Sequence, residues 1–188
     1  MEIELHIEEL ETERRANRLQ WFDNAGLEGI VGRFLSFRDD NTFVWLRAFS
    51  APLPDQNFVR RETTIHLTPT IGSTIHELSD FARISEPVIE LRQYRIAKGQ
   101  RDRFATFLRD RTLDAQLRLG MTVHGPFNAA EDDEVLVWFR GFPSLEERDR
   151  RKAAFYQGHY WLNELEEEAF SMIEDYSNVI LLTPASAP

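Results

Sequence analysis

The chain opens with a strict alternation of apolar and polar side chains. Apolar residues stand at positions 3, 5 and 7, and Glu4, His6 and Glu8 stand between and after them. This period of two predicts a strand over residues 1–10 with one apolar and one polar face. The apolar spacing then becomes helical over residues 11–25, and the glycine that follows is typical of a helix end.

Two more strands and a less regular segment complete the first half. Residues 29–38 and 42–50 are rich in β-branched and aromatic side chains, and the Asp-Asp-Asn turn between them predicts a hairpin. Beyond a proline-containing loop, we expect a broken helix over residues 58–78 and a short strand over residues 82–85. Pro87 ends this half.

The pattern restarts at residue 88. A strand, a helix and a hairpin are predicted there, at residues 88–96, 100–119, and 121–127 with 134–142. Ser144 and Glu147 have the spacing of a capping box, which predicts the start of a second helix. Gly158 interrupts this helix, and a last strand is predicted over residues 178–183.

A repeated stretch links the two halves. Phe-Val-Trp-Leu-Arg-Ala-Phe at positions 43–49 returns as Val-Trp-Phe-Arg-Gly-Phe within positions 135–142, so Trp45 and Arg47 correspond to Trp138 and Arg140. Further along, Pro87 aligns with Pro184, and Phe58 aligns with Phe155. Each half therefore follows a β-α-β-β-α-β order, which predicts a tandem duplication with repeats at residues 1–87 and 88–184 and a tail at residues 185–188.

This order predicts an α+β protein made of two ferredoxin-like repeats. Such a unit packs its helices on one face of a sheet and leaves the other face bare. We expect the bare faces to carry Trp45, Phe49, Trp138 and Phe142, which are too apolar to remain in water. The two repeats would then pack sheet to sheet as an intrachain α/β barrel with its helices outside.

Composition narrows the functional classes. The 188 residues carry a net charge of −10, which argues against nucleic acid or an anionic membrane as partner. The sequence has no cysteine, which suits the reducing cytoplasm. We expect no signal peptide and no membrane span.

Polar residues on the predicted strands form the candidate site. Glu90, Arg92 and Tyr94 lie on the strand face opposite Ile89 and Leu91. If those two apolar residues face the helices, the polar set points into the barrel. Other candidates on neighbouring strands are His124, Trp138 and Arg140, with His6, Trp45 and Arg47 in the first half.

Two interpretations of this set remain open. In the first, it forms a pocket that holds a small polar or anionic aromatic ligand and moves protons, with His124, Tyr94 and Glu90 as catalytic candidates. In the second, which we prefer, the charges pair with one another across strands because buried charges need partners. Arg47 and Arg140 would then only neutralise Glu4 and Glu90.

Residues 155–161 contain four aromatic side chains around Gly158. They would either cover a mouth of the barrel or pack the helix onto the sheet, and we prefer packing. Arg148, Arg150 and Arg151 are expected on a solvated helix face. No spacing of His, Asp or Glu indicates a metal site, and no phosphate loop, dinucleotide motif or nucleophile elbow is present, so we expect no cofactor.

The second half resembles a NIPSNAP domain of the dimeric α/β-barrel superfamily. The matching residues are Glu90-Leu91-Arg92-x-Tyr94, Gly99, Gly120, Gly125, Val137-Trp138, Ser144-Leu-Glu-Glu-Arg148 and Trp161. The first half departs from this pattern, because His6 and Glu8 replace Arg92 and Tyr94. In the second half, Lys98 stands before Gly99 where a proline is usual. The resemblance implies a barrel and self-association, here a homodimer, without an agreed reaction.

The sequence is therefore consistent with three functions. The first is a NIPSNAP-like protein of undetermined function that binds a small molecule. The second is implied by superfamily relatives: a small-aromatic monooxygenase or isomerase, with or without haem, in which His124 is the base, Tyr94 a hydrogen-bond donor and Arg92 the anion anchor. The third is an assembly module that acts through self-association.

Overall fold

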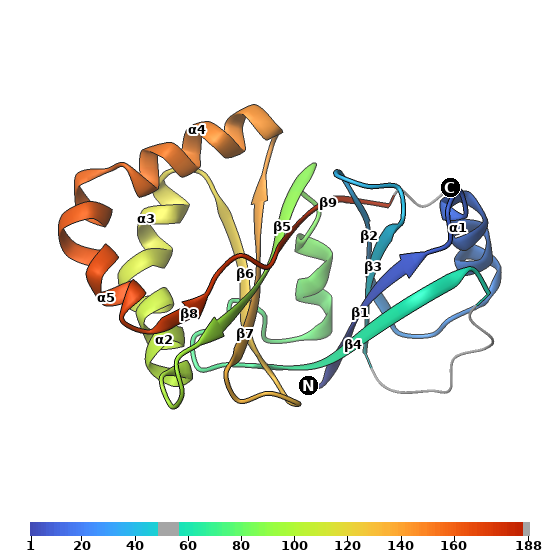
Figure 1. The fold of residues 1–188 in the computed structure, drawn as a ribbon, viewed down its shortest axis with the longest axis horizontal. Coiled ribbons are helices and arrows are strands. Elements are labelled where there is room, and N and C mark those ends of the chain that lie inside the picture. Colours follow the sequence, from blue (N-terminus) through green and yellow to red (C-terminus); the bar gives the residue numbers. More distant parts are fainter. Residues whose placement is uncertain (49–56, 186–188) are drawn as a thin grey trace.

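The computed structural model describes residues 1–48 and 57–185 as a closed eight-stranded antiparallel barrel with helices outside (Figure 1). The α+β class and the barrel expected from the sequence are confirmed. The first half contributes β1 (Ile3–Leu10), α1 (Arg15–Asn24), β2 (Ile30–Ser36), β3 (Thr42–Ala48), β4 (Val59–Pro69) and the 3-10 helix η1 (Leu78–Arg83).

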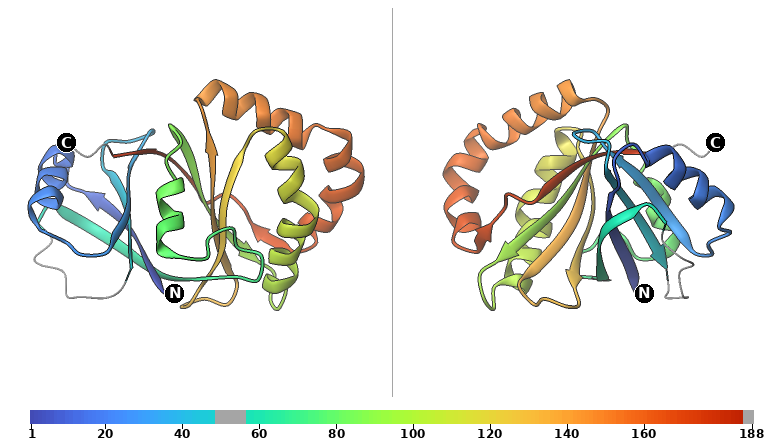
Figure 2. Two further views of the ribbon diagram at one scale, coloured as in Figure 1. Left: turned by 180° about the vertical axis from the view of Figure 1, so that it is seen from behind. Right: turned by 45° about the vertical axis from the view of Figure 1, so that its right-hand side comes forward.

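The second half contributes more helix. Its strands are β5 (Val88–Ile96), β6 (Thr122–Ala129), β7 (Val135–Phe142), β8 (Ile173–Asp175) and β9 (Val179–Pro184). Its helical segments are α2 (Arg101–Phe107), the π-helix η2 (Leu108–Thr112), α3 (Leu113–Arg118), α4 (Leu145–Tyr156), the π-helix η3 (Trp161–Leu165) and α5 (Glu166–Phe170). Helices α2 to α5 lie on one side of the barrel and α1 lies on the other (Figure 2).

The barrel is made of two sheets with the same strand order. β4-β1-β3-β2 forms one sheet and β9-β5-β7-β6 the other, and the pairs β2–β9 and β4–β6 close the barrel. Glu4 faces Arg47 across the β1–β3 ladder, as Glu90 faces Arg140 across the β5–β7 ladder. The division into repeats at residues 1–87 and 88–184 stays a prediction.

The interior of the barrel is filled by aliphatic and phenyl side chains. Ile89 and Leu91 meet Val137 and Phe139 there, together with the corresponding residues of the first half. Our expectation that Ile89 and Leu91 face the helices is therefore wrong. Alternation separates two faces of a strand, but only the packing decides which face an eight-stranded barrel encloses.

The bulkier aromatic residues lie on the outer face. Trp138 and Phe142 pack beneath α2 and α4, and Trp45 packs beneath α1 beside Phe22. We had expected these aromatic residues to join the two sheets, and that expectation is wrong. Phe49, which was grouped with them, lies outside the described residues.

The end of the first half differs most from expectation. Residues 59–69 form β4, not a broken helix, and residues 82–85 end a 3-10 helix rather than forming a strand. The Thr-rich sequence suits a strand, because β-branched side chains fit a pleated surface. The alignment of Pro87 with Pro184 is also wrong: Pro184 ends β9, whose counterpart β4 ends at Pro69.

Gly29 has a backbone that other residues rarely adopt. Its φ is +74°, and a Cβ atom there would lie 2.6 Å from the carbonyl oxygen of Ala48. The Gly29 carbonyl also accepts a hydrogen bond from the Ala48 amide at 2.8 Å. Glycine therefore lets the chain enter β2 against the end of β3.

Candidate functional site

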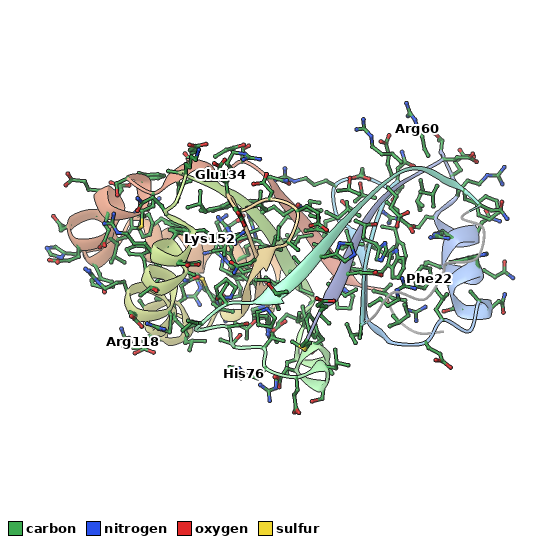
Figure 3. All side chains as sticks on the ribbon, turned by 90° about the horizontal axis from the view of Figure 1, so that it is seen from below. Phe22, Arg60, His76, Arg118, Glu134 and Lys152 are labelled. Carbon is green, nitrogen blue, oxygen red and sulfur yellow. The ribbon has the colours of Figure 1, made fainter. Side chains whose placement is uncertain are left out.

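A cavity of about 460 Å³ lies between the outer face of the second sheet and helices α2 to α5. Its walls are mostly aromatic, and its lining includes Tyr94, Phe104, Phe107, Trp138, Phe155, Tyr156 and Trp161. Arg92, Arg140, Arg148 and Lys152 also line it. The labelled Lys152 lies beside this helical layer, and Phe22 lies on the other side of the molecule, at α1 (Figure 3).

Glu90 binds four cations at the polar end of this cavity. Its Oε2 accepts hydrogen bonds from Arg92 at 2.5 Å and from Arg140 at 2.7 and 3.0 Å. Its Oε1 accepts from Arg148 at 2.7 Å and from Lys152 at 3.0 Å. Because one buried carboxylate meets four cations, this end of the cavity keeps an excess of positive charge.

The electrostatics of the cluster follow from this imbalance. Burial alone would raise the pKa of Glu90, but the charges of Arg140, Arg92, Lys152 and Arg148 outweigh it and hold that pKa far below its usual range. Burial lowers the pKa of Lys152, against the attraction of Glu90. Glu90 therefore remains a carboxylate throughout the physiological pH range.

A phenol also belongs to the cluster. Arg140 donates to the Tyr156 hydroxyl at 3.0 Å and to the Gln116 side chain at 3.2 Å. Burial would raise the pKa of Tyr156, but the charges of Arg140 and Arg92 outweigh it and bring that pKa below its ordinary value. On the other side, Arg92 donates to the Tyr94 hydroxyl. The arrangement can bind an anion and hold a proton near it.

Two π-helical segments shape the cavity wall. Leu108 and Thr112 in η2, and Trp161 in η3, all line the cavity. A π-turn widens a helix locally and is frequent at functional sites. The one signal in the sequence was Gly158, which lies just before η3. Phe155 and Trp161 pack onto the outer face of the sheet, as we preferred, and with Tyr156 they form part of the wall of this outer cavity rather than covering a mouth of the barrel.

The predicted site residues divide between the two faces of the sheet. Arg92, Tyr94, Trp138 and Arg140 line the cavity, but on the helical side and not inside the barrel, so the expected location is wrong. Their role as ligand-binding residues stays a prediction.

His124 does not join the other candidates. It pairs with Phe139, whose side chain faces the barrel interior, and its Nε2 lies 3.3 Å from Glu86. Thr122 on the same strand also donates to Glu86. His124 is therefore held by a carboxylate away from the cavity.

The corresponding region of the first half is filled by its own side chains. His6 stacks on Trp45 with ring centroids 3.7 Å apart, and its two nitrogens contact Glu62 and Glu4. Arg47 donates to Glu4 at 2.5 and 3.0 Å. The pairing of each strand arginine with its glutamate, which we preferred, is thus present in both halves.

Arg18 occupies the rest of that space. It is fully buried and forms a double hydrogen bond with Glu8, which also accepts from the Trp45 indole at 2.9 Å. Its charge lies 4.1 Å from the centre of the Trp21 ring. A single helix, α1, covers the first sheet. The polar side chains on the outer face of that sheet fill the space beneath the helix.

Sequence analysis missed several residues of the second-half cluster. Arg148 was expected in solvent, yet it contacts Glu90 and is only 14% exposed in its side chain. Lys152 and Gln116 were not considered. Arg148 and Lys152 lie four residues apart, on one face of α4, and that spacing was the available signal.

Within the described residues, no group of three or more His, Cys, Asp or Glu side chains is arranged to hold a metal ion. The described helices include none that is long and apolar enough to cross a membrane.

The fold and its cavity define an α/β barrel of the ferredoxin-like type. The NIPSNAP family model matches residues 89–188, which is more than half of the chain. The chain belongs to the NIPSNAP family. A search of the curated proteins finds no match.

Solved structures show the same fold over the whole chain. A "putative monooxygenase" from Lactobacillus acidophilus superposes with a TM-score of 0.68 at 11% identity, covering 97% of this chain and 93% of its own. A "putative monooxygenase" from Fusobacterium nucleatum has a TM-score of 0.60 at 9% identity, covering 98% and 92%. A "putative chlorite dismutase" has a TM-score of 0.59 at 11% identity, covering 99% and 96%. At these identities the likeness establishes the fold alone.

Proposed function

We propose that this chain binds a small anionic molecule with an aromatic or apolar body in the second-half cavity. The observation that carries the proposal is the Glu90 cluster, in which one carboxylate meets Arg92, Arg140, Arg148 and Lys152 at the end of an aromatic-walled cavity. An anionic group would take up the remaining positive charge, and the aromatic walls would bury the body of the ligand.

The size and shape of the cavity support a small ligand. Its volume of about 460 Å³ falls in the range typical of small-molecule sites, roughly 300–1,000 Å³. Its walls come from the sheet and from two helices with π-turns, so the space is built into the secondary structure.

Matched naphthalene probes test the proposal by calorimetry. We expect 1-naphthalenesulfonate, an anion, to bind and 1-naphthol, its neutral counterpart, to bind at least about fivefold more weakly, because a charge-assisted hydrogen bond is worth about 1.5 kcal/mol or more. Lys152→Gln should weaken sulfonate binding and leave naphthol binding unchanged. Equal binding of the two probes, or binding of neither, contradicts the proposal.

The chain offers a matched control for this variant. Its only lysines are Lys98 and Lys152, and Lys98 is exposed in the turn after β5. Lys98→Gln removes the same charge from the whole molecule but not from the cavity. It should therefore bind both probes like the unmodified protein.

A second candidate function is proton transfer or oxygenation on the bound aromatic, as in a monooxygenase or isomerase. The specific observation in its favour is Tyr156, a half-buried phenol in the cavity whose pKa is lowered by Arg140. A haem is not supported by the described residues, because those lining the cavity include no His, Cys or Met. Of the lining phenols, Tyr94 and Tyr156 are engaged by arginines, and Tyr176 is 53% exposed. Oxygen uptake with 1-naphthol that is absent in Tyr156→Phe would support oxygenation, and no uptake contradicts oxygenation.

Self-association is a further part of the proposal. The barrel closes within one chain, so a second copy is not needed to complete it. Exposed apolar side chains near the cavity support a homodimer, namely Tyr160, Leu162, Phe170 and Tyr176. Light scattering tests this, and a strict monomer contradicts it.

A cytoplasmic location is proposed from the lack of cysteine and is tested by cell fractionation.

A further inference from the structure

A residue of the first half reaches the second-half cavity. Arg38 lines that cavity, although it follows β2 in the chain. The closure of the barrel brings it there: the Phe37 amide donates to the Leu181 carbonyl on β9 at 2.9 Å. Leu181 in turn pairs with Glu90 on β5. Arg38 therefore lies at the polar end of the cavity, beside β9, the strand that pairs with Glu90. Figure 1 shows β9 running between β2 and β5.

Arg38 is a cation without a counterion among the residues that the structure describes. Its backbone amide binds Ser36, but its guanidinium group makes no hydrogen bond or ion pair with the described residues. Its side chain is exposed, so it can move toward a ligand. The other arginine of the β2 strand region, Arg33, is already paired with Asp23.

The cluster itself also has unused binding capacity. The Arg92 Nε atom is buried and has no hydrogen-bond partner, and Arg92 is only 5% exposed. Glu90 neutralises one of the four cations around it, and Asp149 pairs with Arg148. Glu166 also lines the cavity. With Arg38 included, the cavity therefore holds about two positive charges in excess of Glu90, Asp149 and Glu166, which is still more than one monoanion neutralises.

We propose that the natural ligand carries a doubly charged oxyanion head, such as a phosphate monoester or a compact dicarboxylate, and that Arg38 selects for the second charge. The inference rests on the proposed binding function of the same cavity. In this arrangement the first half, whose own outer face is filled by side chains, supplies a specificity residue to the site of the second half.

Calorimetric titration with 1-naphthyl phosphate and 1-naphthalenesulfonate tests the inference. The phosphate ester is a dianion at pH 8 and a monoanion at pH 5, because its second pKa is about 6. The sulfonate stays a monoanion at both. We expect the phosphate to bind about tenfold more tightly than the sulfonate at pH 8, and the two to bind alike at pH 5, since one added charge-assisted hydrogen bond is worth about that factor.

Arg38→Gln should remove the preference at pH 8, because it weakens binding of the phosphate dianion far more than binding of the sulfonate. Arg61→Gln is the matched control, because Arg61 is an exposed arginine of the first half away from the cavity, and it should keep the preference. Thermal unfolding of both variants checks that the fold is intact.

The outcomes separate this inference from the proposed function. Equal affinities of the two probes at pH 8 overturn the dianion preference while the binding function stands. A preference that persists in Arg38→Gln overturns the role of Arg38. Binding of neither probe overturns the binding function and this inference together.

Discussion

Replacing Glu90 with glutamine removes the charge that holds four cations together. Glu90 is fully buried, and two of its partners, Arg92 and Arg140, have side chains that are 6% and 2% exposed. Arg148 and Lys152 are more exposed, at 14% and 26%, and can turn toward water. The cost of Glu90→Gln therefore falls mainly on the two buried arginines.

The magnitude follows from leaving buried charges without a partner. Breaking a buried ion pair on one side typically costs about 3–5 kcal/mol. For a chain of this length that corresponds to a fall in Tm of roughly 6–20 °C. Urea unfolding followed by tryptophan fluorescence at pH 7 measures the loss of unfolding free energy directly.

The pH dependence gives a second test of the same reasoning. The pKa of Glu90 in the folded protein is depressed below its ordinary value of 4.5, so its contribution to stability is present above about pH 4.5 and is lost as the pH falls through the folded pKa. The stability difference between the unmodified protein and Glu90→Gln should be full at pH 7 and shrink below about pH 4.5.

Glu174→Gln, on an exposed position of β8, is the control and should change the unfolding free energy by less than about 0.5 kcal/mol. If Glu90→Gln costs less than about 1 kcal/mol at pH 7, the carboxylate is not the centre of the cluster and the reasoning fails.

Three further predictions concern other parts of the chain. Trp45→Phe loses the indole bond to Glu8 and should cost about 1–3 kcal/mol in urea unfolding without altering probe binding. The hydrogen bond to Glu131 raises the pKa of His66. This pair therefore stabilises the fold below about pH 6.5, and the contribution is lost as the pH rises through the folded pKa of His66. Glu131→Gln should lower the His66 pKa in an NMR titration. Gly29→Ala should cost about 1–3 kcal/mol in unfolding free energy, because its backbone is left-handed and the added Cβ would meet the Ala48 carbonyl oxygen.

Each of these predictions has an outcome that contradicts it. Gly26→Ala is the comparison for Gly29→Ala, because its φ is +59° but no atom lies within 4 Å of the added Cβ; an equal cost for both would contradict the contact with Ala48. A His66 titration that is unchanged in Glu131→Gln would show that this pair does not form. Probe binding that changes in Trp45→Phe would mean that the two halves are coupled.

The strands of the second half were predictable because their local signals agree. In β5, Ile89 and Leu91 alternate with Glu90 and Arg92, and the Ser144 hydroxyl accepts from the Glu147 amide as the capping box predicts. The first half was misread after residue 58, because the alignment assumed a second helix that this half does not form. Local patterns gave no warning, since a Thr-rich stretch suits both a strand and a loop.

The strand residues that line the cavity were singled out from the sequence, but their place in the fold was not. Alternation alone placed Glu90, Arg92 and Tyr94 on one face, and the repeated Trp-x-Arg stretch added Trp138 and Arg140. The sequence could not assign His124, which pairs with the inward-facing Phe139, because alternation shows which residues of β6 share a face but not which face the barrel encloses.

The sequence by itself determined the strands other than β4 and β8, the helices of the second half and the sharing of faces, because these depend on residue spacing along one segment. Only the tertiary structure decided that the polar face lies under the helices, that Arg148 and Lys152 join Glu90, and that Arg38 reaches the cavity across the β2–β9 seam. Such contacts depend on how the sheets close, and the closure is a property of the whole barrel rather than of any one segment.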